Sequence, residues 1–123
     1  MSSWIRRAYE PPTRNDGCRV LIDRLWPRGI SKEDLAVDVW LREIAPSTAL
    51  RKWFDHDPAK WEGFQTRYFR ELRRNEEALK DLRERLQRGG RVTLVYGARD
   101  TEHNDAVALR TFLQARTGRH TKE

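Results

Sequence analysis

The stretch Val20-Leu21-Ile22-Asp23-Arg24-Leu25-Trp26-Pro27-Arg28-Gly29 decides the fold class of this chain. It begins with three apolar residues in a row, a pattern that predicts a strand covered on both faces. Turn residues at Asn15-Asp16-Gly17 precede it, and Pro27 and Gly29 end it, so we expect a strand from Cys18 to Leu25. The later run Val92-Thr93-Leu94-Val95-Tyr96 has the same character and predicts a buried central strand.

Helices are expected between and after these strands, where apolar residues recur every three or four positions. We expect one helix from Ser31 to Ile44, a short one after Ser47, a long one from Asp57-Pro58, another that Gly89-Gly90 ends, and a last one from Thr101 to Arg116. Residues 4–9 form a further candidate strand. Strands separated by helices predict an α/β fold: a small, largely parallel three-stranded sheet with helices packed on it, in a single compact domain over residues 1–123.

The chain is basic and rich in arginine. Lys and Arg number 25 against 19 Asp and Glu, for a net charge of +6, and 20 of the 25 basic residues are Arg. The planar guanidinium group suits phosphate and carboxylate better than the lysine ammonium does. This composition favours an anionic partner. The alternative is that the Arg residues on helix surfaces only solvate those surfaces.

Cysteine usage and hydropathy indicate the compartment. Cys18 is the only cysteine, which excludes an internal disulfide framework and fits a reducing environment. No stretch approaches the roughly 20 apolar residues that a membrane helix needs, and no apolar segment follows the N-terminal residues. We therefore expect a cytoplasmic protein without a membrane partner, and the sequence does not define its oligomeric state.

The first candidate site segment is the end of the Cys18 strand. Asp23 and Arg24 place a carboxylate and a guanidinium where the strand leaves the core, and Arg28 follows in a tight turn. Two arginines around Trp26 could grip a phosphate while the indole stacks on a base or a sugar. The structural alternative is that Asp23 forms an ion pair with an arginine and that Trp26 fills the core.

The second candidate segment, residues 97–104, follows the Val92 strand. Gly97 allows close backbone approach, Arg99 adds positive charge, and the start of the last helix offers free N–H groups to an anion. Asp100 and His103 could transfer protons, and Asn104 could position a ligand oxygen. The structural alternatives are that Asp100 caps the helix and that His103 and Asn104 carry no function. Because ligands of parallel sheets gather at the carboxyl ends of the strands, we expect both segments to converge there.

Metal and cofactor sites are not expected. Residues 53–58 contain Asp55, His56 and Asp57, but adjacent loop residues seldom all point at one ion, and Asp57 is expected to cap a helix. The sequence contains no Walker loop and no GxGxxG, HExxH or GxSxG motif. We predict no metal and no cofactor.

Several motifs together resemble the YeaO-like branch of the domain of unknown function 488 family. They are Tyr9-Glu10-Pro11-Pro12, Asp16 through Gly29, Leu50-Arg51-Lys52-Trp53-Phe54, His56-Asp57-Pro58 and Glu102-His103-Asn104. The resemblance covers nearly the whole chain, and its Asp23 to Gly29 block is the most specific part. A related branch carries a Cys and a Cys-His-Arg element near the last strand and helix start, where this chain has Tyr96 or Gly97 and His103-Asn104. The resemblance therefore implies no thiol chemistry here and assigns no activity.

Three functional hypotheses follow from the sequence. The first is an enzyme or a sensor for a phosphorylated or nucleotide-like anion, with Arg24, Trp26, Arg28, Arg99 and Asn104 binding and with Asp23, Asp100 and His103 available for proton transfer. The second is a nucleic-acid-binding module without catalysis that uses the arginines of residues 67–91, although acidic residues interrupt that stretch. The third is a protein-interaction domain. The sequence alone does not decide whether the protein is an enzyme.

Overall fold

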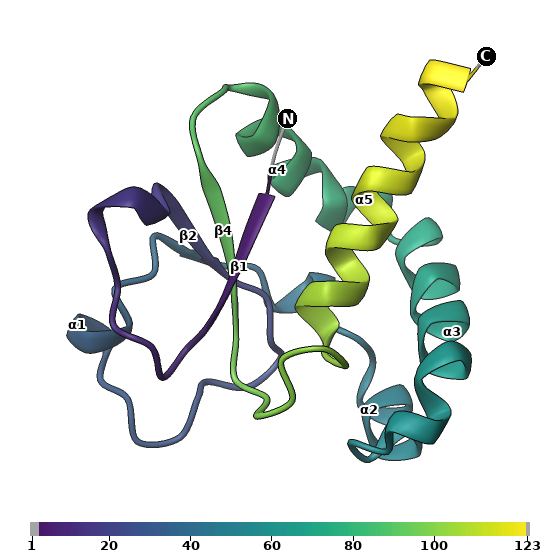
Figure 1. Ribbon diagram of the computed structural model, residues 1–123, viewed down its shortest axis with the longest axis horizontal. Coiled ribbons are helices and arrows are strands. Elements are labelled where there is room, and N and C mark those ends of the chain that lie inside the picture. The colour runs from purple at the N-terminus through teal and green to yellow at the C-terminus, as the bar shows by residue number, and fades with distance from the viewer. Residues whose placement is uncertain (1–2, 123) are drawn as a thin grey trace.

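The computed structural model describes residues 3–122, which form a sheet with helices around it (Figure 1). The strands are β1 (Ser3–Arg7), β2 (Cys18–Leu21), β3 (Val39–Trp40) and β4 (Val92–Tyr96). They stand in the order β1-β4-β2-β3, and each neighbouring pair is parallel. The predicted α/β class and parallel sheet are confirmed, but the described sheet has four strands where we expected three.

Besides the strands, the described chain contains five α-helices and three short 3-10 helices. The α-helices are α1 (Lys32–Leu35), α2 (Thr48–Phe54), α3 (Trp61–Arg73), α4 (Glu76–Gln87) and α5 (Asp105–Lys122), and the 3-10 helices are η1 (Arg14–Asp16), η2 (Arg42–Ile44) and η3 (Pro58–Lys60). The expected caps are present: Ser31 Oγ accepts a hydrogen bond from the Asp34 amide, and Ser47 Oγ accepts one from the Leu50 amide. No helix within residues 3–122 combines the length and the apolar character that a bilayer crossing requires.

The helix predicted over residues 31–44 is wrong beyond Leu35. Ala36 has a left-handed backbone, with φ of 52°, and this residue closes α1 after about one turn. The chain then extends and pairs with β2 as β3. Leu35 and Val39 have helical spacing, but Val39 is branched and precedes an aromatic residue, which also fits a strand. Pairing with β2 therefore favours the strand over the helix for residues 39–40.

Three further boundaries differ from the prediction. β1 ends at Arg7, two residues before the predicted end, and β2 ends at Leu21 although we expected Leu25. The last helix begins at Asp105, four residues later than predicted. Charged and turn-forming residues follow each of these strands, so the ladders stop where the polar segments of the sheet edge begin.

The late start of α5 follows from its cap. Asn104 Oδ1 accepts a hydrogen bond from the Val107 amide at 2.9 Å, which makes Asn104 the capping residue. Asp100, the expected cap, instead accepts hydrogen bonds from the amides of Glu102 and His103 in the turn before the helix. The capping role predicted for Asp100 is therefore wrong.

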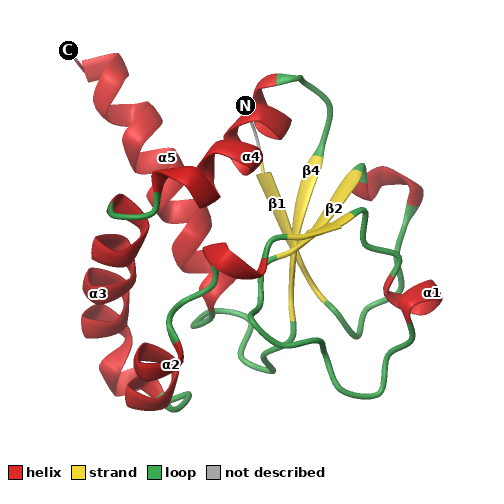
Figure 2. Ribbon diagram, turned by 180° about the vertical axis from the view of Figure 1, so that it is seen from behind, coloured by secondary structure: helices red, strands yellow, loops and turns green. Residues whose placement is uncertain are grey.

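The two faces of the sheet contact different apolar clusters. Val20, Ile22 and Leu94 pack with buried side chains of α2 to α5, which lie together on one side of the sheet (Figure 2). Leu21 and Val95 pack on the other face, with Leu35 and with the segment between β2 and β3. The stripes predicted for α3 and α4 are part of the first cluster: Phe64, Tyr68, Leu72, Leu79, Leu82 and Leu86 are buried. The two central strands β2 and β4 are therefore covered on both faces, whereas Trp4 of the edge strand β1 is 47% exposed.

A buried arginine ties the segment after β2 to the sheet. Arg19 in β2 is 3% exposed and donates from Nη1 to Asp16 Oδ2 at 2.7 Å and from Nη2 to the Leu35 carbonyl at 2.7 Å. Burial alone would raise the pKa of Asp16, but hydrogen bonds from Thr13 and Arg19 outweigh it and hold that pKa below its usual value. Since Leu35 ends α1, this network fixes both ends of the connection that carries Asp23 to Gly29.

Candidate ligand-binding site

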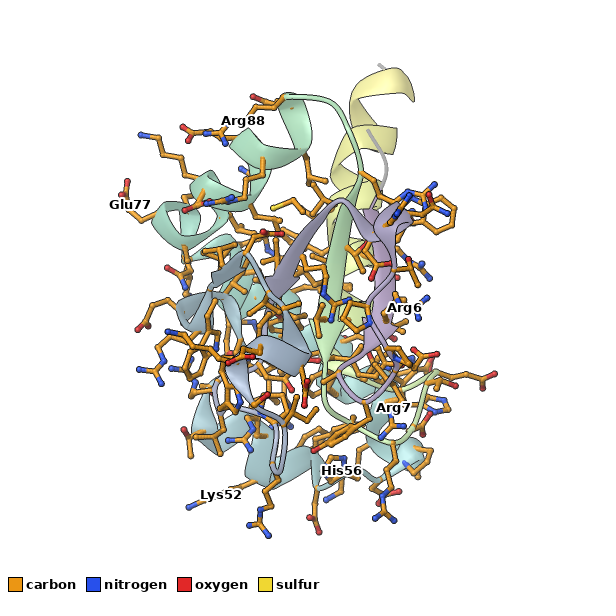
Figure 3. The ribbon with its side chains drawn as sticks, turned by 90° about the vertical axis from the view of Figure 1, so that its left-hand side faces the viewer. Arg6, Arg7, Lys52, His56, Glu77 and Arg88 are labelled. Atoms are coloured by element: carbon orange, nitrogen blue, oxygen red, sulfur yellow. The ribbon has the colours of Figure 1, made fainter. Side chains whose placement is uncertain are left out.

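A cavity of about 1060 Å³ opens at the carboxyl edge of the sheet. Five parts of the chain form its walls: the turn after β1, the segment after β2, helix α2 with its flanking residues, Phe64 of α3, and residues 97–105 after β4. Figure 3 shows Lys52 and His56 at this end of the molecule, with Glu77 and Arg88 at the opposite end. Parallel strands thus bring the segments that follow β1, β2 and β4 to one pocket, as expected for this class of sheet.

Most of the residues singled out from the sequence line this cavity. They are Asp23, Arg24, Trp26, Arg99, Asp100, His103 and Asn104. Arg28 is not among the lining residues: its side chain is exposed, and its carbonyl accepts a hydrogen bond from Tyr9 Oη at 2.9 Å. The predicted grip of Arg24 and Arg28 on one phosphate therefore does not form within this cavity.

Asp23 is held by the backbone of the neighbouring strand exit. Its Oδ2 accepts a hydrogen bond from the Gly97 amide at 2.8 Å, and a Cβ at position 97 would lie only 3.2 Å from that oxygen. Trp40 Nε1 donates to the Asp23 carbonyl at 2.6 Å. Among residues 3–122, Asp23 forms no ion pair with an arginine, so the ion-pair part of the structural alternative is wrong, whereas Trp26 does pack against a core cluster. The carboxylate is fixed in place but carries no compensating charge.

Asp105 faces Asp23 and is the most perturbed acid of the site. It stands at the first residue of α5, and both its side chain and that of Asp23 line the cavity. Burial, together with the charge of Asp23, raises the pKa of Asp105 well above its usual value. The sequence analysis passed over Asp105, although it directly follows Asn104 in a segment assigned to this edge.

Arg24 and Trp26 shape the wall that follows β2. Arg24 donates from Nε to the Pro46 carbonyl at 3.3 Å and from Nη2 to the Ala45 carbonyl at 3.2 Å, which ties this wall to the start of α2. Trp26 Nε1 donates to the Ile30 carbonyl, and its ring meets Trp40 edge-on at 5.4 Å. Both side chains have structural partners and still line the cavity.

Asp100 and His103 form a hydrogen-bonded pair on the opposite wall. His103 Nδ1 lies 2.8 Å from Asp100 Oδ2, and the edge of the imidazole packs on Trp61 with ring centres 5.3 Å apart. Hydrogen bonds from the Glu102 amide and from His103 lower the pKa of Asp100. When Nδ1 donates to this carboxylate, the neutral ring keeps Nε2 as an acceptor. The pair can therefore accept a hydrogen bond or a proton from a ligand.

Cationic and aromatic side chains complete the cavity. Arg51 and Lys52 of α2 and Arg99 after β4 are exposed and line it, and within the described chain none of the three is in an ion pair. Phe54 and Phe64 supply an aromatic wall, with ring centres 4.5 Å apart. Of these five, only Arg99 was expected, because the sequence does not show where α2 and α3 lie relative to the sheet edge.

The structure gives Asn104 a capping role and shows no metal site among the described residues. Asn104 is 3% exposed, its Oδ1 caps α5, and its Nδ2 donates to the Asp100 carbonyl. Its oxygen and one of the two N–H donors of its side-chain amide are therefore engaged within the protein. Within residues 3–122, no three His, Cys, Asp or Glu side chains are grouped so that they could hold a metal ion.

The fold and the cavity define a class: a small parallel α/β protein with a charged, ligand-sized pocket at the carboxyl edge of its sheet. The family model described as "Inactive DUF488-N3 subclade" matches residues 4–123, so the chain belongs to the domain of unknown function 488 family, in its YeaO-like branch. The resemblance seen in the sequence motifs is confirmed.

Curated relatives match along nearly their whole length. The chain is 41% identical over 115 residues to the uncharacterized protein YeaO of Escherichia coli K12, which covers 94% of this chain and 99% of that protein. It is 39% identical over 112 residues to the uncharacterized proteins Mb3100c of Mycobacterium bovis and Rv3073c of Mycobacterium tuberculosis, covering 91% of this chain and 93% of each relative. No solved structure matches the chain significantly.

Proposed function

We propose that the protein binds a small phosphorylated or nucleotide-like anion in the cavity at the carboxyl edge of its sheet and does not transform it. The observation that supports this proposal is the grouping of Arg51, Lys52 and Arg99 on one ligand-sized cavity, with no ion pair for any of them in the described chain. Cations without protein partners at a concave, partly aromatic surface are suited to an anionic ligand that carries a flat or apolar portion.

The mouth of the cavity supports a ligand with such a portion. Tyr9 and Leu25 line the cavity and are 46% and 60% exposed, so both offer apolar surface to a ligand. Phe54 and Phe64 lie further along the same surface. A ring or a sugar face of the ligand would cover these side chains while its anionic group binds the cations.

The description of the matching family favours binding without turnover over catalysis. The matching subclade is described as inactive. The Asp100 and His103 pair then serves as a hydrogen-bonding wall for the ligand. A sensor or carrier of the ligand fits these features better than an enzyme does.

The nucleic-acid alternative has less support, because many arginines of residues 67–91 already have partners. Arg83 pairs with Glu76, Arg85 pairs with Asp81, and Arg67 stacks on the Trp53 ring at 4.0 Å. These contacts use the guanidinium groups that a continuous phosphate-binding face would need.

The proposal is tested by titrating the protein with adenosine 5′-monophosphate and with inorganic phosphate, followed by calorimetry and by amide chemical shifts in NMR spectra. The variant R51Q/K52Q removes two cavity cations, and K80Q/R88Q removes two exposed cations of α4 and its end, away from the cavity. Losing charge-assisted hydrogen bonds of about 1.5–3 kcal/mol each should weaken binding at least about tenfold in R51Q/K52Q and less than twofold in the control.

Three results contradict the proposal. One is the absence of binding by either probe at millimolar concentration, and another is equal weakening by the two double variants. The third is conversion of adenosine 5′-monophosphate during incubation, seen as a new phosphorus signal, which would replace binding by catalysis.

A further inference from the structure

The imidazole of His103 is held in one orientation by three contacts. Its Nδ1 lies 2.8 Å from Asp100 Oδ2, its amide donates to Asp100 Oδ1 at 3.0 Å, and its ring meets the Trp61 ring edge-on. Trp61 in turn stacks on Phe64, a lining residue of the cavity, with ring centres 5.6 Å apart. The ring is therefore a fixed part of the cavity wall, and it needs little rearrangement to meet a ligand.

The loop that carries the Asp100 and His103 pair is anchored at both ends. Arg7 of β1 donates from Nε to the Ala98 carbonyl at 2.9 Å. Asn104, which caps α5, donates from Nδ2 to the Asp100 carbonyl at 2.9 Å. These hydrogen bonds join the loop to the sheet on one side and to the last helix on the other, so the pair is preorganised.

The hydrogen bond to Asp100 decides what the ring can offer a ligand. An ionised carboxylate only accepts hydrogen bonds, so Nδ1 carries the proton that joins the pair. In the neutral imidazole, Nε2 is then the unprotonated nitrogen and is a hydrogen-bond acceptor. Such a nitrogen does not bind a phosphate oxygen, which is itself an acceptor. It requires a donor group elsewhere on the same ligand.

A hydroxyl group suits this acceptor better than an ammonium group does. Arg51 and Lys52 lie on α2, Arg99 lies on the loop of the pair, and within the described chain none of the three is in an ion pair. An ammonium group in the same cavity would meet these positive charges, whereas a hydroxyl group carries no charge. Phosphate esters of sugars combine an anionic group for the cations with hydroxyl donors for the imidazole.

We propose that His103, positioned by Asp100, accepts a hydrogen bond from a hydroxyl group of the ligand, so that the cavity selects phosphate esters of sugars with free hydroxyl groups. This inference rests on the proposed function and names the chemical class of its ligand. A nucleotide and a simple sugar phosphate share this chemistry. His103 determines the specificity, and Asp100 fixes the tautomer and the orientation of its ring.

The experiment compares adenosine 5′-monophosphate with 2′,3′-dideoxyadenosine 5′-monophosphate by calorimetry at pH 8. The two ligands share the base and the phosphate and differ only in the ribose hydroxyl groups. We expect the wild type to bind the hydroxylated ligand at least about fivefold more tightly, because its analogue leaves the acceptor without a partner. H103F keeps an aromatic ring beside Trp61 but has no acceptor, so the preference should fall below about twofold.

The ratio of the two affinities is the readout, because a variant that only disturbs the loop weakens both ligands alike. H56N is the matched control. His56 also lines the cavity, and asparagine tolerates its left-handed backbone, with φ of 55°. H56N should keep the full preference for the hydroxylated ligand. Loss of the preference in H56N as well as in H103F would overturn the assignment to His103.

The nitrogen chemical shifts of the His103 ring test the role of Asp100 in the wild type itself. We expect Nδ1 to be protonated and Nε2 to be bare, and we expect adenosine 5′-monophosphate to shift the Nε2 signal while leaving it unprotonated. The dideoxy analogue should not produce this shift. D100N should give a mixture of the two tautomers and a smaller preference for the hydroxylated ligand. A ring that becomes doubly protonated when the nucleotide binds would overturn the inference, because Nε2 would then donate to the phosphate.

Two smaller probes separate the sources of the ligand chemistry. Ribose 5-phosphate that binds within about threefold of adenosine 5′-monophosphate indicates a sugar phosphate, and weaker binding indicates a nucleotide. In both cases H103F should weaken the binding of ribose 5-phosphate at least about fivefold. Phosphoethanolamine offers an ammonium group in place of hydroxyl groups, and tighter binding of this probe than of ribose 5-phosphate would overturn the inference.

The outcomes distinguish the failure of this inference from the failure of the proposed function. Equal affinities of the wild type for the nucleotide and its dideoxy analogue, or a preference that persists in H103F, overturn the inference while leaving the proposed function intact. Absence of binding by every phosphorylated probe overturns the proposed function and this inference with it.

Discussion

Replacing Arg19 with methionine should destabilise the fold strongly, because it breaks a buried ion pair. Arg19 and Asp16 are 3% and 4% exposed, and their charged atoms lie 2.7 Å apart. Methionine fills much of the same volume but leaves the Asp16 carboxylate with only the more distant Arg6, whose Nε is 3.7 Å from Oδ2, and leaves the Leu35 carbonyl without its 2.7 Å donor. Removing one partner of a buried pair costs about 3–5 kcal/mol.

The Thr13 amide and hydroxyl still donate to Asp16 in this variant, so we expect the lower end of that range, about 3 kcal/mol. For a chain of 123 residues, this corresponds to a fall of roughly 10–15 °C in the melting temperature. Urea unfolding followed by circular dichroism measures the free energy of unfolding directly. Arg14→Met is the matched control: Arg14 is exposed on η1, and its loss should change that free energy by less than about 0.5 kcal/mol.

The stability lost in the R19M variant should depend on pH in a defined direction. The pKa of Asp16 in the folded protein lies below its unfolded value of about 3.9, so the pair contributes its full stability above that pH. The contribution disappears as pH falls through the lower, folded pKa. The difference between wild type and R19M should therefore shrink on strong acidification. A loss below about 1 kcal/mol at pH 7, or an equal loss at pH 7 and pH 2, would refute this account of the buried pair.

Two further substitutions test the surroundings of the site. Tyr68→Phe removes the 2.7 Å hydrogen bond to the buried Ile44 carbonyl and should lower the free energy of unfolding by about 1–3 kcal/mol, and a change below about 0.5 kcal/mol in urea unfolding would contradict the contact. Gly97→Ala places a Cβ 3.2 Å from Asp23 Oδ2, so it should displace that carboxylate, cost about 1 kcal/mol in urea unfolding and lengthen the hydrogen bond from the amide of residue 97. An unchanged free energy of unfolding and an amide proton of residue 97 that exchanges with solvent as slowly as in the wild type would contradict this contact.

The sequence predicted the sheet edge well because local patterns define it. Runs such as Val20-Leu21-Ile22 and Val92 to Tyr96 are typical of buried strands, and the charged residues that follow each of them mark its carboxyl end. Parallel pairing then brings Asp23 and residues 97–104 together without any further information. The predicted convergence of these two segments needed only strand polarity.

Other features required tertiary contacts that no local pattern encodes. β3 contains two residues, and its conformation depends on pairing with β2 more than on its own composition. Arg51 and Lys52 reach the cavity only because α2 packs beside the sheet edge, held there in part by the hydrogen bonds of Arg24 to the Ala45 and Pro46 carbonyls. The shift of the α5 start from Thr101 to Asp105 depends on a choice between Asp100 and Asn104 as cap, two residues with nearly equal capping preference.

Asp16 and Asp105 differ in whether their surroundings stabilise the ionised carboxylate, and only the surroundings of Asp16 are explained by a contribution to folding stability. Asp16 is enclosed by donors and a guanidinium, and its pKa is lowered, so its ionised form stabilises the fold. Asp105 is buried near another acid, and both its burial and that charge raise its pKa, so ionisation of Asp105 destabilises the fold as pH rises through that pKa. A chain with 20 arginines could place a cation beside Asp105, yet its cavity keeps Arg51, Lys52 and Arg99 away from ion pairs within the described residues. A ligand with acceptor groups for the cations and donor groups for the acids would bind to such a concave surface. This arrangement is the physical reason to look for function at the carboxyl edge of the sheet.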